Sequence, residues 1–273
     1  MTLQRITRPL LYLFLIGLSL FFLMPVYVML ITSVKPIDEV TLDQMWALPT
    51  SIDWSSYSQA FSRLAPNLLN TLYLVIPATI LSALLGSLNG YVLSKWKFKG
   101  ADWIFTAILF GMFIPYQSIL IPLIQFLREV NLYNTIPGLI LVHVVYGIPI
   151  TTLMFRNFYA NIPKEMLESA QVDGAGFFRI YRHIMFPLSI TGFVVVGIWQ
   201  FTNIWNEFLF AVSITTTSQQ PVMVALQNLS GSQIVQWNVQ MAGALLAALP
   251  TLLVYIILGK YFVRGLLAGS VKG

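Results

Sequence analysis

Long apolar runs constrain this chain more than any other feature of its sequence. A membrane-spanning helix needs about 20 apolar residues, and the first run, from about residue 10 to residue 32, has that length without a charged side chain. Backbone polar groups inside a bilayer must pair within their own segment, so such runs fold as helices. Apolar residues make up 57% of the chain and charged residues 9%, which excludes an ordinary soluble domain. We therefore predict an all-α integral membrane protein.

The apolar runs predict a bundle of six transmembrane helices in a single domain, residues 1–273. The spans cover about 10–32, 67–93, 103–127, 132–155, 187–214 and 239–263. The first run exceeds the apolar core of a cleaved signal peptide, so we expect it to remain attached. Pro115 and Pro149, in the third and fourth spans, should kink or break those helices. Gly86 and Gly90 have the spacing of a close helix contact, although chance explains that match equally well.

The distribution of Lys and Arg predicts the orientation, because cytoplasmic loops carry more of them. With a cytoplasmic amino terminus, the basic residues on the inside are Arg5, Arg8, Lys95, Lys97, Lys99, Arg156, Lys164, Arg179, Arg182, Lys260, Arg264 and Lys272. Those left outside are Lys35, Arg63 and Arg128. Both termini are therefore expected in the cytoplasm, together with the polar stretch 162–187.

The stretch 162–187 is the one long polar interruption late in the chain. Glu165 suits the positive end of a helix, and Gly174 suits a stop, so a helix of about three turns is expected. Leu167, Ala170 and Gly174 fall on one face of that helix. Because Ala and Gly present almost no side chain, we expect the backbone of a partner to approach this face closely.

The spacing within the stretch also resembles the EAA signature of the membrane subunits of ABC importers. The residues that carry the likeness are Glu168, Ser169, Ala170, Asp173, Gly174, Ala175, Ile184 and Pro187. Ser169 stands where the signature has Ala, and Phe186 where it has Leu. The resemblance implies a cytoplasmic coupling helix, with Glu165 in its first turn, that docks on an ATPase subunit. From the helix alone, an amphipathic linker on the membrane surface is the alternative.

The sequence predicts Glu207 as the one ionisable residue inside a span. A carboxylate in a membrane costs several kcal/mol unless it is paired or hydrated, so Glu207 should face the bundle interior or a cavity. Asn203 is three residues before Asn206 and four residues before Glu207. This spacing places all three on one helical face. That face either lines a solute path or forms a polar clamp between helices.

Residues 215–238, between the fifth and sixth spans, contain no charged side chain. The polar residues in this loop include Gln219, Gln220, Gln227, Asn228, Ser230 and Gly231. Amides and hydroxyls can replace hydrogen bonds to a sugar without strong electrostatic selection. The loop is either a contact for a binding protein, as the resemblance to ABC importers implies, or a solvated connection.

Trp205, Asn206, Glu207 and Phe208, together with the tail 264–273, resemble the smaller permease subunit of carbohydrate (maltose-type) ABC importers. The resemblance implies a sugar permease in the inner membrane of a prokaryote. It also implies three protein partners: a second permease subunit, an ABC ATPase dimer and an extracytoplasmic sugar-binding protein. A permease for a sugar phosphate, an amino acid or a peptide shares the coupling stretch and stays open, as does a proton-coupled carrier that uses Glu207. A membrane scaffold without transport activity is the plainest alternative.

The sequence contains no motif for nucleotide binding or catalysis. Its one Gly-Lys pair, Gly259 and Lys260, is followed by Tyr rather than by Ser or Thr, so it forms no phosphate-binding loop. We therefore expect no enzyme activity in this chain, with ATP and Mg²⁺ bound by the partner ATPase. The chain has no cysteine, and His143 and His183 lie far apart, so no metal site is expected. Besides those proteins the expected partner is membrane lipid, with no nucleic acid.

Overall fold

The computed structural model describes the backbone of residues 3–231 and 235–270, and the side chains of residues 8–231 and 235–261. Within these ranges the regular elements are all helices, and no strand occurs. The all-α prediction is therefore confirmed. The side chains of Arg5 and of the tail 264–273, Lys272 included, lie outside the described part, as do residues 232–234 of the loop 215–238.

Four helices are long and apolar enough to cross a membrane. They are α1 (Leu3–Ser33), α2 (Ser55–Lys95), α5 (Ile136–Ala160) and α12 (Trp237–Ser270). Two bent pairs of helices also qualify, with bends of 89° and 75°. If each bent pair is one span, the described part of the chain has up to six spans, so the count of six stays a prediction.

The third predicted span, 103–127, contains the sharper break. Helix α3 (Ala101–Phe110) and the turn η2 (Gly111–Phe113) end before Pro115, and the turn η3 (Tyr116–Ile119) leads into α4 (Leu120–Glu129). Pro115 has an extended backbone and lacks the N–H that a helix would need. The expected break is therefore present, whereas α5 continues through Pro149.

Helix α2 begins at Ser55, although the second predicted span began at about residue 67. The backbone N–H and the hydroxyl of Ser55 both donate to the carboxylate of Asp53 at 2.8 Å. These bonds cap the helix and lower the pKa of Asp53. The first part of the helix is polar, so the apolar runs of the sequence do not indicate it.

Shorter helices occupy the later half of the chain. They are α6 (Lys164–Val172), α7 (Phe177–Ile180), the π-helical turn η4 (Tyr181–Met185), α8 (Phe186–Leu188), α9 (Ile190–Trp205), α10 (Leu209–Ile214), the turn η5 (Thr217–Gln219) and α11 (Val222–Leu229). The fifth predicted span, 187–214, is thus divided at Ser189 and again between α9 and α10. A short 3-10 turn, η1 (Ile37–Glu39), follows α1.

The chain divides into two compact units. Unit 1 comprises residues 1–66 and 225–249 and has a small core in which Ala60 packs against Val239 and Ala242. Lys35 is 2% exposed in this unit, and its ammonium donates to the carbonyl of Gln44 at 2.6 Å. A lysine that is buried and hydrogen-bonded in this way is an ordered part of its loop.

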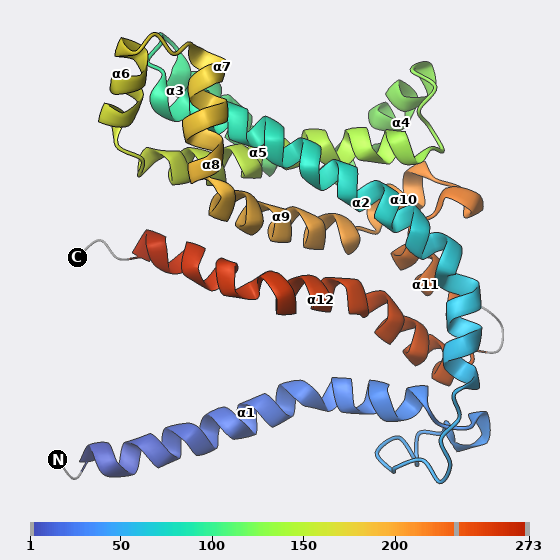
Figure 1. Ribbon diagram of the computed structural model, residues 1–273. Helices are drawn as coiled ribbons and strands as arrows, with labels where there is room; N and C mark the ends of the chain where they lie inside the picture. Colours follow the sequence, from blue (N-terminus) through green and yellow to red (C-terminus); the bar gives the residue numbers. More distant parts are fainter. Residues whose placement is uncertain (1–2, 232–234, 271–273) are drawn as a thin grey trace. The chain divides into compact units, whose positions relative to one another are not determined.

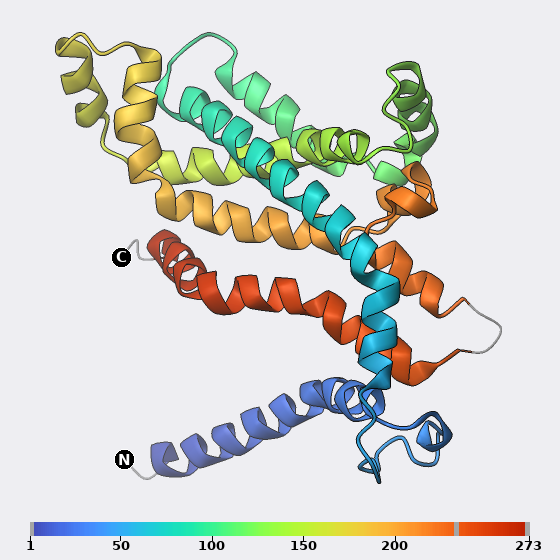
Figure 2. The ribbon, with the colours of Figure 1, turned by 45° about the vertical axis from the view of Figure 1, so that its right-hand side comes forward.

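Unit 2 comprises residues 67–224 and 250–273, and in it α2, α5 and α9 lie side by side (Figures 1 and 2). A Cβ atom at Gly90 would lie 2.7 Å from the backbone nitrogen of Arg156 in α5, and one at Gly86 would overlap Thr151. The hydroxyl of Thr151 donates to the carbonyl of Ser82 in α2 at 3.0 Å. The two glycines therefore do form a close helix contact, rather than a chance match.

Candidate functional site

A pocket of about 830 Å³ opens within unit 2. Its wall is formed by α5, α9, α10 and the broken segment around Pro115. Asn203, Asn206 and Glu207, the three residues predicted to line a solute path, all lie on this wall. The geometry thus brings the three together around one hollow, while a role in transport stays a prediction.

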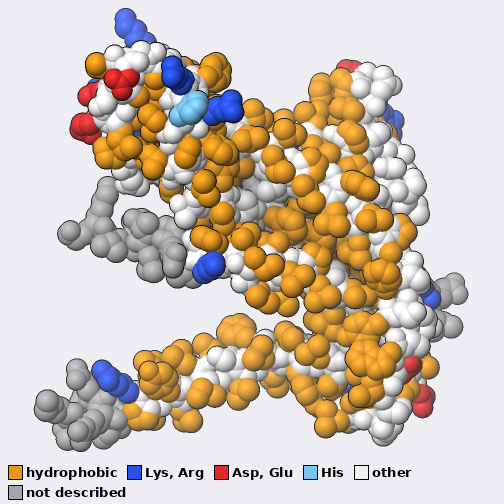
Figure 3. Space-filling model, viewed as in Figure 1, with side chains coloured by type: hydrophobic (Ala, Val, Ile, Leu, Met, Phe, Trp, Pro, Cys, Tyr) orange, Lys and Arg blue, Asp and Glu red, His pale blue; other side chains and the backbone are white. Residues whose placement is uncertain are grey.

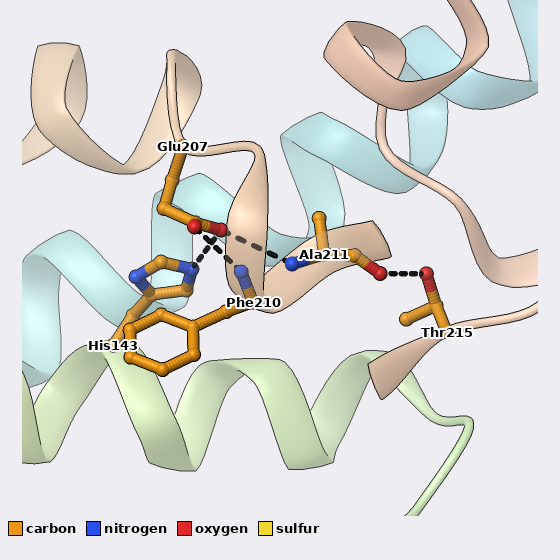
Figure 4. Close-up of polar contacts among 5 residues, drawn as sticks. All are labelled: His143, Glu207, Phe210, Ala211 and Thr215. Atoms are coloured by element: carbon orange, nitrogen blue, oxygen red, sulfur yellow. Dashed lines mark hydrogen bonds and ion pairs between the residues drawn. The ribbon is translucent and has the colours of Figure 1, made fainter. Parts of the chain in front are cut away.

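Glu207 lies in the turn between two helices, not on a helical face. Helix α9 ends at Trp205, with Asn206 as its cap, and α10 begins at Leu209. The Glu207 carboxylate accepts hydrogen bonds from the backbone N–H of Phe210 at 2.6 Å and of Ala211 at 3.2 Å (Figure 4). The prediction of one continuous helical face is therefore wrong, and the carboxylate is held by the first turn of α10.

His143 is the residue that sequence reasoning missed. It lies in α5 with 6% of its surface exposed, and its Nε2 is 3.7 Å from Oε2 of Glu207 (Figure 4). That distance is too long for a hydrogen bond, and Nε2 has no other hydrogen-bond partner among the described residues. The rule that singled out Glu207, an ionisable residue inside a span, applies to His143 as well. The prediction that Glu207 stands alone is wrong.

Amides and one indole complete the polar part of the wall. The amide nitrogens of Asn203 and Asn206 donate to carbonyls one turn earlier in α9, at 2.9 and 2.8 Å, and both residues are exposed. Gln200 donates to the hydroxyl of Ser82 at 2.9 Å. Trp199 is 43% exposed beside them. The pocket thus offers fixed hydrogen-bonding groups and a flat apolar surface.

The predicted coupling stretch forms a second region of unit 2, around α6. Leu167 is 6% exposed and belongs to a core cluster with Tyr91 and Phe155, against which Ala170 also packs. The face with Leu167 and Ala170 therefore points into this chain, and the prediction that it receives a partner is wrong. The exposed face carries Glu165, Glu168, Ser169 and Val172.

The way in which α6 ends accounts for the glycine at position 174. Gly174 has φ +77°, which a residue with a Cβ rarely adopts. Its N–H donates to the carbonyl of Gln171 at 3.0 Å, and that of Ala175 donates to the carbonyl of Ala170 at 2.9 Å. This is the Schellman pattern of helix termination. The predicted stop is confirmed, because α6 ends at Val172 with Asp173 as its exposed cap.

The remaining residues of the coupling stretch follow α6. Ala175 and Ile184 pack against the same core cluster as Leu167, and Pro187 is exposed in α8. Ile184 itself lies in the π-helical turn η4. Turns of this type are frequent at functional sites, although they do not identify one.

Four hydroxyl groups connect this region with the core of unit 2. Ser87 of α2 lies 2.5 Å from the hydroxyl of Tyr159 and 2.8 Å from that of Tyr181. Tyr159 in turn lies 3.1 Å from the hydroxyl of Ser189, at the break before α9. The chain of bonds therefore ties the turn after α6 to α2, α5 and the start of α9.

The predicted loop 215–238 is more ordered than its composition suggested, because it contains η5 and α11. Gln219 ends η5, and the carbonyl of Gln220 accepts a bond from Asn67 of α2 at 2.7 Å. Gln227 and Asn228 lie exposed in α11, followed by Ser230 and by Gly231, which is also exposed. None of this assigns a partner to the loop.

Within the described residues, no group of three or more His, Cys, Asp or Glu side chains is placed to hold a metal ion. The expectation that the protein has no metal site stays a prediction.

The sequence profile of the family described as "binding-protein-dependent transport system inner membrane component" matches residues 78–267. A probable ABC transporter permease protein of Pyrococcus horikoshii is 46% identical, over 98% of this chain and 98% of that protein. The xylose/arabinose import permease protein of Haloferax volcanii is 33% identical over 97% of this chain and 92% of its own length. The glucose import system permease protein of Saccharolobus solfataricus is also 33% identical, over 96% and 95%.

The fold has a close counterpart among solved structures. A chain of a bacterial ABC transporter involved in the import of the acidic polysaccharide alginate superposes with a TM-score of 0.83, covering 94% of this chain and 97% of that chain. The two sequences are 21% identical, so this likeness concerns the fold alone.

Proposed function

Because this chain belongs to the family of binding-protein-dependent transport system inner membrane components, we propose that it is a permease subunit of an ATP-driven importer of a sugar, either a mono- or an oligosaccharide. The observation that carries the sugar assignment is the likeness, over nearly the full length, to permeases named for xylose, arabinose and glucose. The chain itself is the translocation subunit rather than an enzyme.

The proposal includes three protein partners. A second permease subunit completes the path through the membrane, and an extracytoplasmic binding protein delivers the sugar to the loop 215–238. Gln219, Gln220, Gln227, Asn228, Ser230 and Gly231 are the residues of that loop with groups for such a contact. An ATPase dimer binds ATP and Mg²⁺ and hydrolyses the nucleotide, since this chain has no phosphate-binding loop.

The ATPase docks on α6 in this proposal. The exposed face with Glu165, Glu168, Ser169 and Val172 is the docking surface, because the opposite face is buried in the chain's own core. Val172 is 88% exposed, and an apolar side chain so exposed at the edge of a charged helix suits burial in a groove. Ala170, Ala175 and Ile184 pack against the core cluster, and Asp173 and Gly174 end the helix, so these residues fix the position of α6. Pro187 lies exposed in α8, later in the same coupling stretch.

The protein lies in the inner membrane, and both termini are proposed to be cytoplasmic. Figure 3 shows Lys and Arg side chains around α6 and α7, together with Asp and Glu side chains, whereas hydrophobic side chains cover much of the surface of the helices. Several Lys and Arg side chains at one end are typical of the cytoplasmic side, because the rule counts these residues rather than net charge. This distribution supports the proposal that α6 lies on the side where an ATPase can reach it.

The solute path runs past the pocket that Asn203, Asn206 and Glu207 line. His143 lines the same pocket, and the described wall includes residues of α5, α9 and α10. A polar clamp between helices needs contact between side chains but no pocket of this volume, so we favour the solute path. Sugars need several fixed hydrogen-bonding groups beside an apolar surface, and this wall offers both.

Reconstitution tests the proposal. The chain is co-expressed with its partner permease and ATPase, purified and placed in liposomes with the binding protein. We expect ATP hydrolysis that the binding protein stimulates in the presence of sugar, and uptake of radiolabelled D-xylose, D-glucose or maltose. A chain that purifies without an ATPase, or a complex that takes up none of these sugars, contradicts the proposal.

A further inference from the structure

The charge of the pocket around Glu207 selects among solutes. Its wall includes Glu207 and His143 but no Lys or Arg. A carboxylate repels another anion, and the repulsion is stronger in a partly buried site than in water. Since no cation on the described wall offsets Glu207, a solute that carries a phosphate or a carboxylate is disfavoured.

The other polar groups of the wall suit a neutral solute with many hydroxyls. Gln117, Gln200, Asn203 and Asn206 are amides, which both donate and accept hydrogen bonds. A sugar hydroxyl also does both, so it can pair with either end of an amide. The exposed indole of Trp199 adds an apolar surface for the ring of the sugar.

Glu207 is held in place from three directions. The N–H groups of Phe210 and Ala211 fix its two oxygens, and the imidazole of His143 lies behind Oε2 at 3.7 Å. His143 is buried, and its Nε2 has no hydrogen-bond partner among the described residues. A carboxylate oxygen accepts more than one bond, so Glu207 keeps acceptor capacity for the pocket. His143 limits the movement of that carboxylate.

We propose that this pocket is a binding site for a neutral sugar within this subunit, in which Glu207 accepts a solute hydroxyl and His143 acts as a positioning residue for Glu207. The inference rests on the proposed function. It narrows the substrate class, because sugar phosphates and uronic acids carry the net negative charge that the wall disfavours. The pocket of about 830 Å³ is within the range that holds small ligands.

The test measures equilibrium binding of sugars to the assembled transporter in nanodiscs, with the fluorescence of Trp199 as the signal. The Trp199→Phe variant identifies the part of the signal that comes from this pocket. The neutral probes are D-xylose, D-glucose and maltose, and the anionic probes are D-glucuronate and glucose 6-phosphate. D-Glucose and D-glucuronate differ only at one carbon, so their ratio of dissociation constants measures the selection against charge.

We expect a neutral sugar to bind, and the Glu207→Gln variant to lower the selection against D-glucuronate about tenfold. His143→Phe should weaken binding of the neutral sugar about tenfold, since the carboxylate is then less well oriented. His143→Gln places an amide N–H near the carboxylate in place of the ring nitrogen that lies 3.7 Å from it, and should recover most of the affinity. Because His143 positions the Glu207 carboxylate, His143→Phe should also lower the selection against D-glucuronate. A merely structural role of His143 would leave the ratio between glucose and glucuronate unchanged in both His143 variants.

Thr152→Val is the matched control, because Thr152 is also a buried polar residue of α5 and its hydroxyl lies 3.4 Å from the amide of Asn89, outside the pocket. It should bind sugar like the unaltered protein. Equal binding of glucose and glucuronate, or unchanged selection in Glu207→Gln, overturns the inference even when ATP-dependent uptake is normal. Absence of ATP-dependent uptake of all three neutral sugars contradicts the proposed function itself.

Discussion

Gly174 shows how a single backbone angle can determine where a helix ends. Its φ of +77° allows the two hydrogen bonds that close α6, and no heavy atom outside its immediate neighbours lies within 4 Å of the place where a Cβ would be. A substitution here therefore has two separable effects. Any side chain strains the backbone, and only a large one adds bulk beside the proposed docking surface of α6.

Gly174→Leu should abolish ATP hydrolysis that depends on the binding protein, while the chain still inserts in the membrane. Gly174→Ala carries a similar backbone strain, about 1 kcal/mol, without the bulk, so it should retain part of the stimulation. Gly176→Leu is the control, since Gly176 has an ordinary φ of −77° and open space around it. The measurement is ATPase stimulation in liposomes, and unchanged stimulation in Gly174→Leu contradicts the assignment of α6.

For single residues, the sequence predicted what a side chain can do better than it predicted which way the side chain points. Gly174 was recognisable as a stop because its residue type suits the angle, and Glu207 because a carboxylate is rare in a membrane. Periodicity placed Leu167 and Ala170 on one face, but it cannot say whether that face points to the chain's own core or to a partner. The core cluster around Tyr91, formed by residues far apart in the sequence, decides that.

Helices α2 and α5 of unit 2 approach each other closely at Gly90. Gly90→Ala places a methyl group 2.7 Å from the backbone nitrogen of Arg156, and backbone cannot move aside as a side chain can. We expect a loss of stability of about 1–3 kcal/mol, as for other overpacked sites. The midpoint of thermal unfolding in detergent measures it. Gly17→Ala in α1, where a Cβ would meet nothing within 4 Å, is the control, and equal midpoints for the two variants contradict the close contact.

Hydrogen bonds through the hydroxyl of Ser87 in α2 connect Tyr181, in the turn after α6, with Tyr159 in α5. Ser87→Ala leaves the hydroxyls of Tyr159 and Tyr181 without the partner they share, at a cost of about 1–3 kcal/mol. We expect a lower unfolding midpoint and more ATP hydrolysed per sugar imported. Ser94→Ala is the control on the same helix, since its hydroxyl bonds a carbonyl of α2 itself. If both variants hydrolyse ATP and import sugar in the same ratio, the hydroxyl chain has no part in coupling.

Element bounds were predictable where apolar residues marked them and not elsewhere. The apolar run of α5 and the proline break before α4 both follow from residue type. The first turns of α2 are polar and are fixed by the Asp53 cap, which an analysis of apolar runs does not detect. Helix α11 lies in a segment without charge, and its buried residues Val222 and Val224 become recognisable only once their packing is known.

The proposed orientation of the whole molecule rests on the distribution of charge and can be checked directly, since the chain contains no cysteine. Lys99→Cys and Asp43→Cys each introduce one exposed thiol. A membrane-impermeant maleimide should label Asp43→Cys in right-side-out vesicles and Lys99→Cys in inverted ones. The reverse pattern of labelling contradicts cytoplasmic termini and removes α6 from the side where ATP is hydrolysed.

The energy source of uptake tests the central claim most directly. Vesicles that contain the assembled transporter are loaded with ATP, supplied with binding protein and radiolabelled sugar, and treated with or without an uncoupler. We predict uptake that requires ATP and the binding protein and is insensitive to the uncoupler, with substantial uptake retained in Glu207→Gln because Gln keeps the shape and most of the hydrogen-bonding capacity of Glu. Uptake by the unaltered protein that follows the proton gradient and needs no ATP would contradict this account.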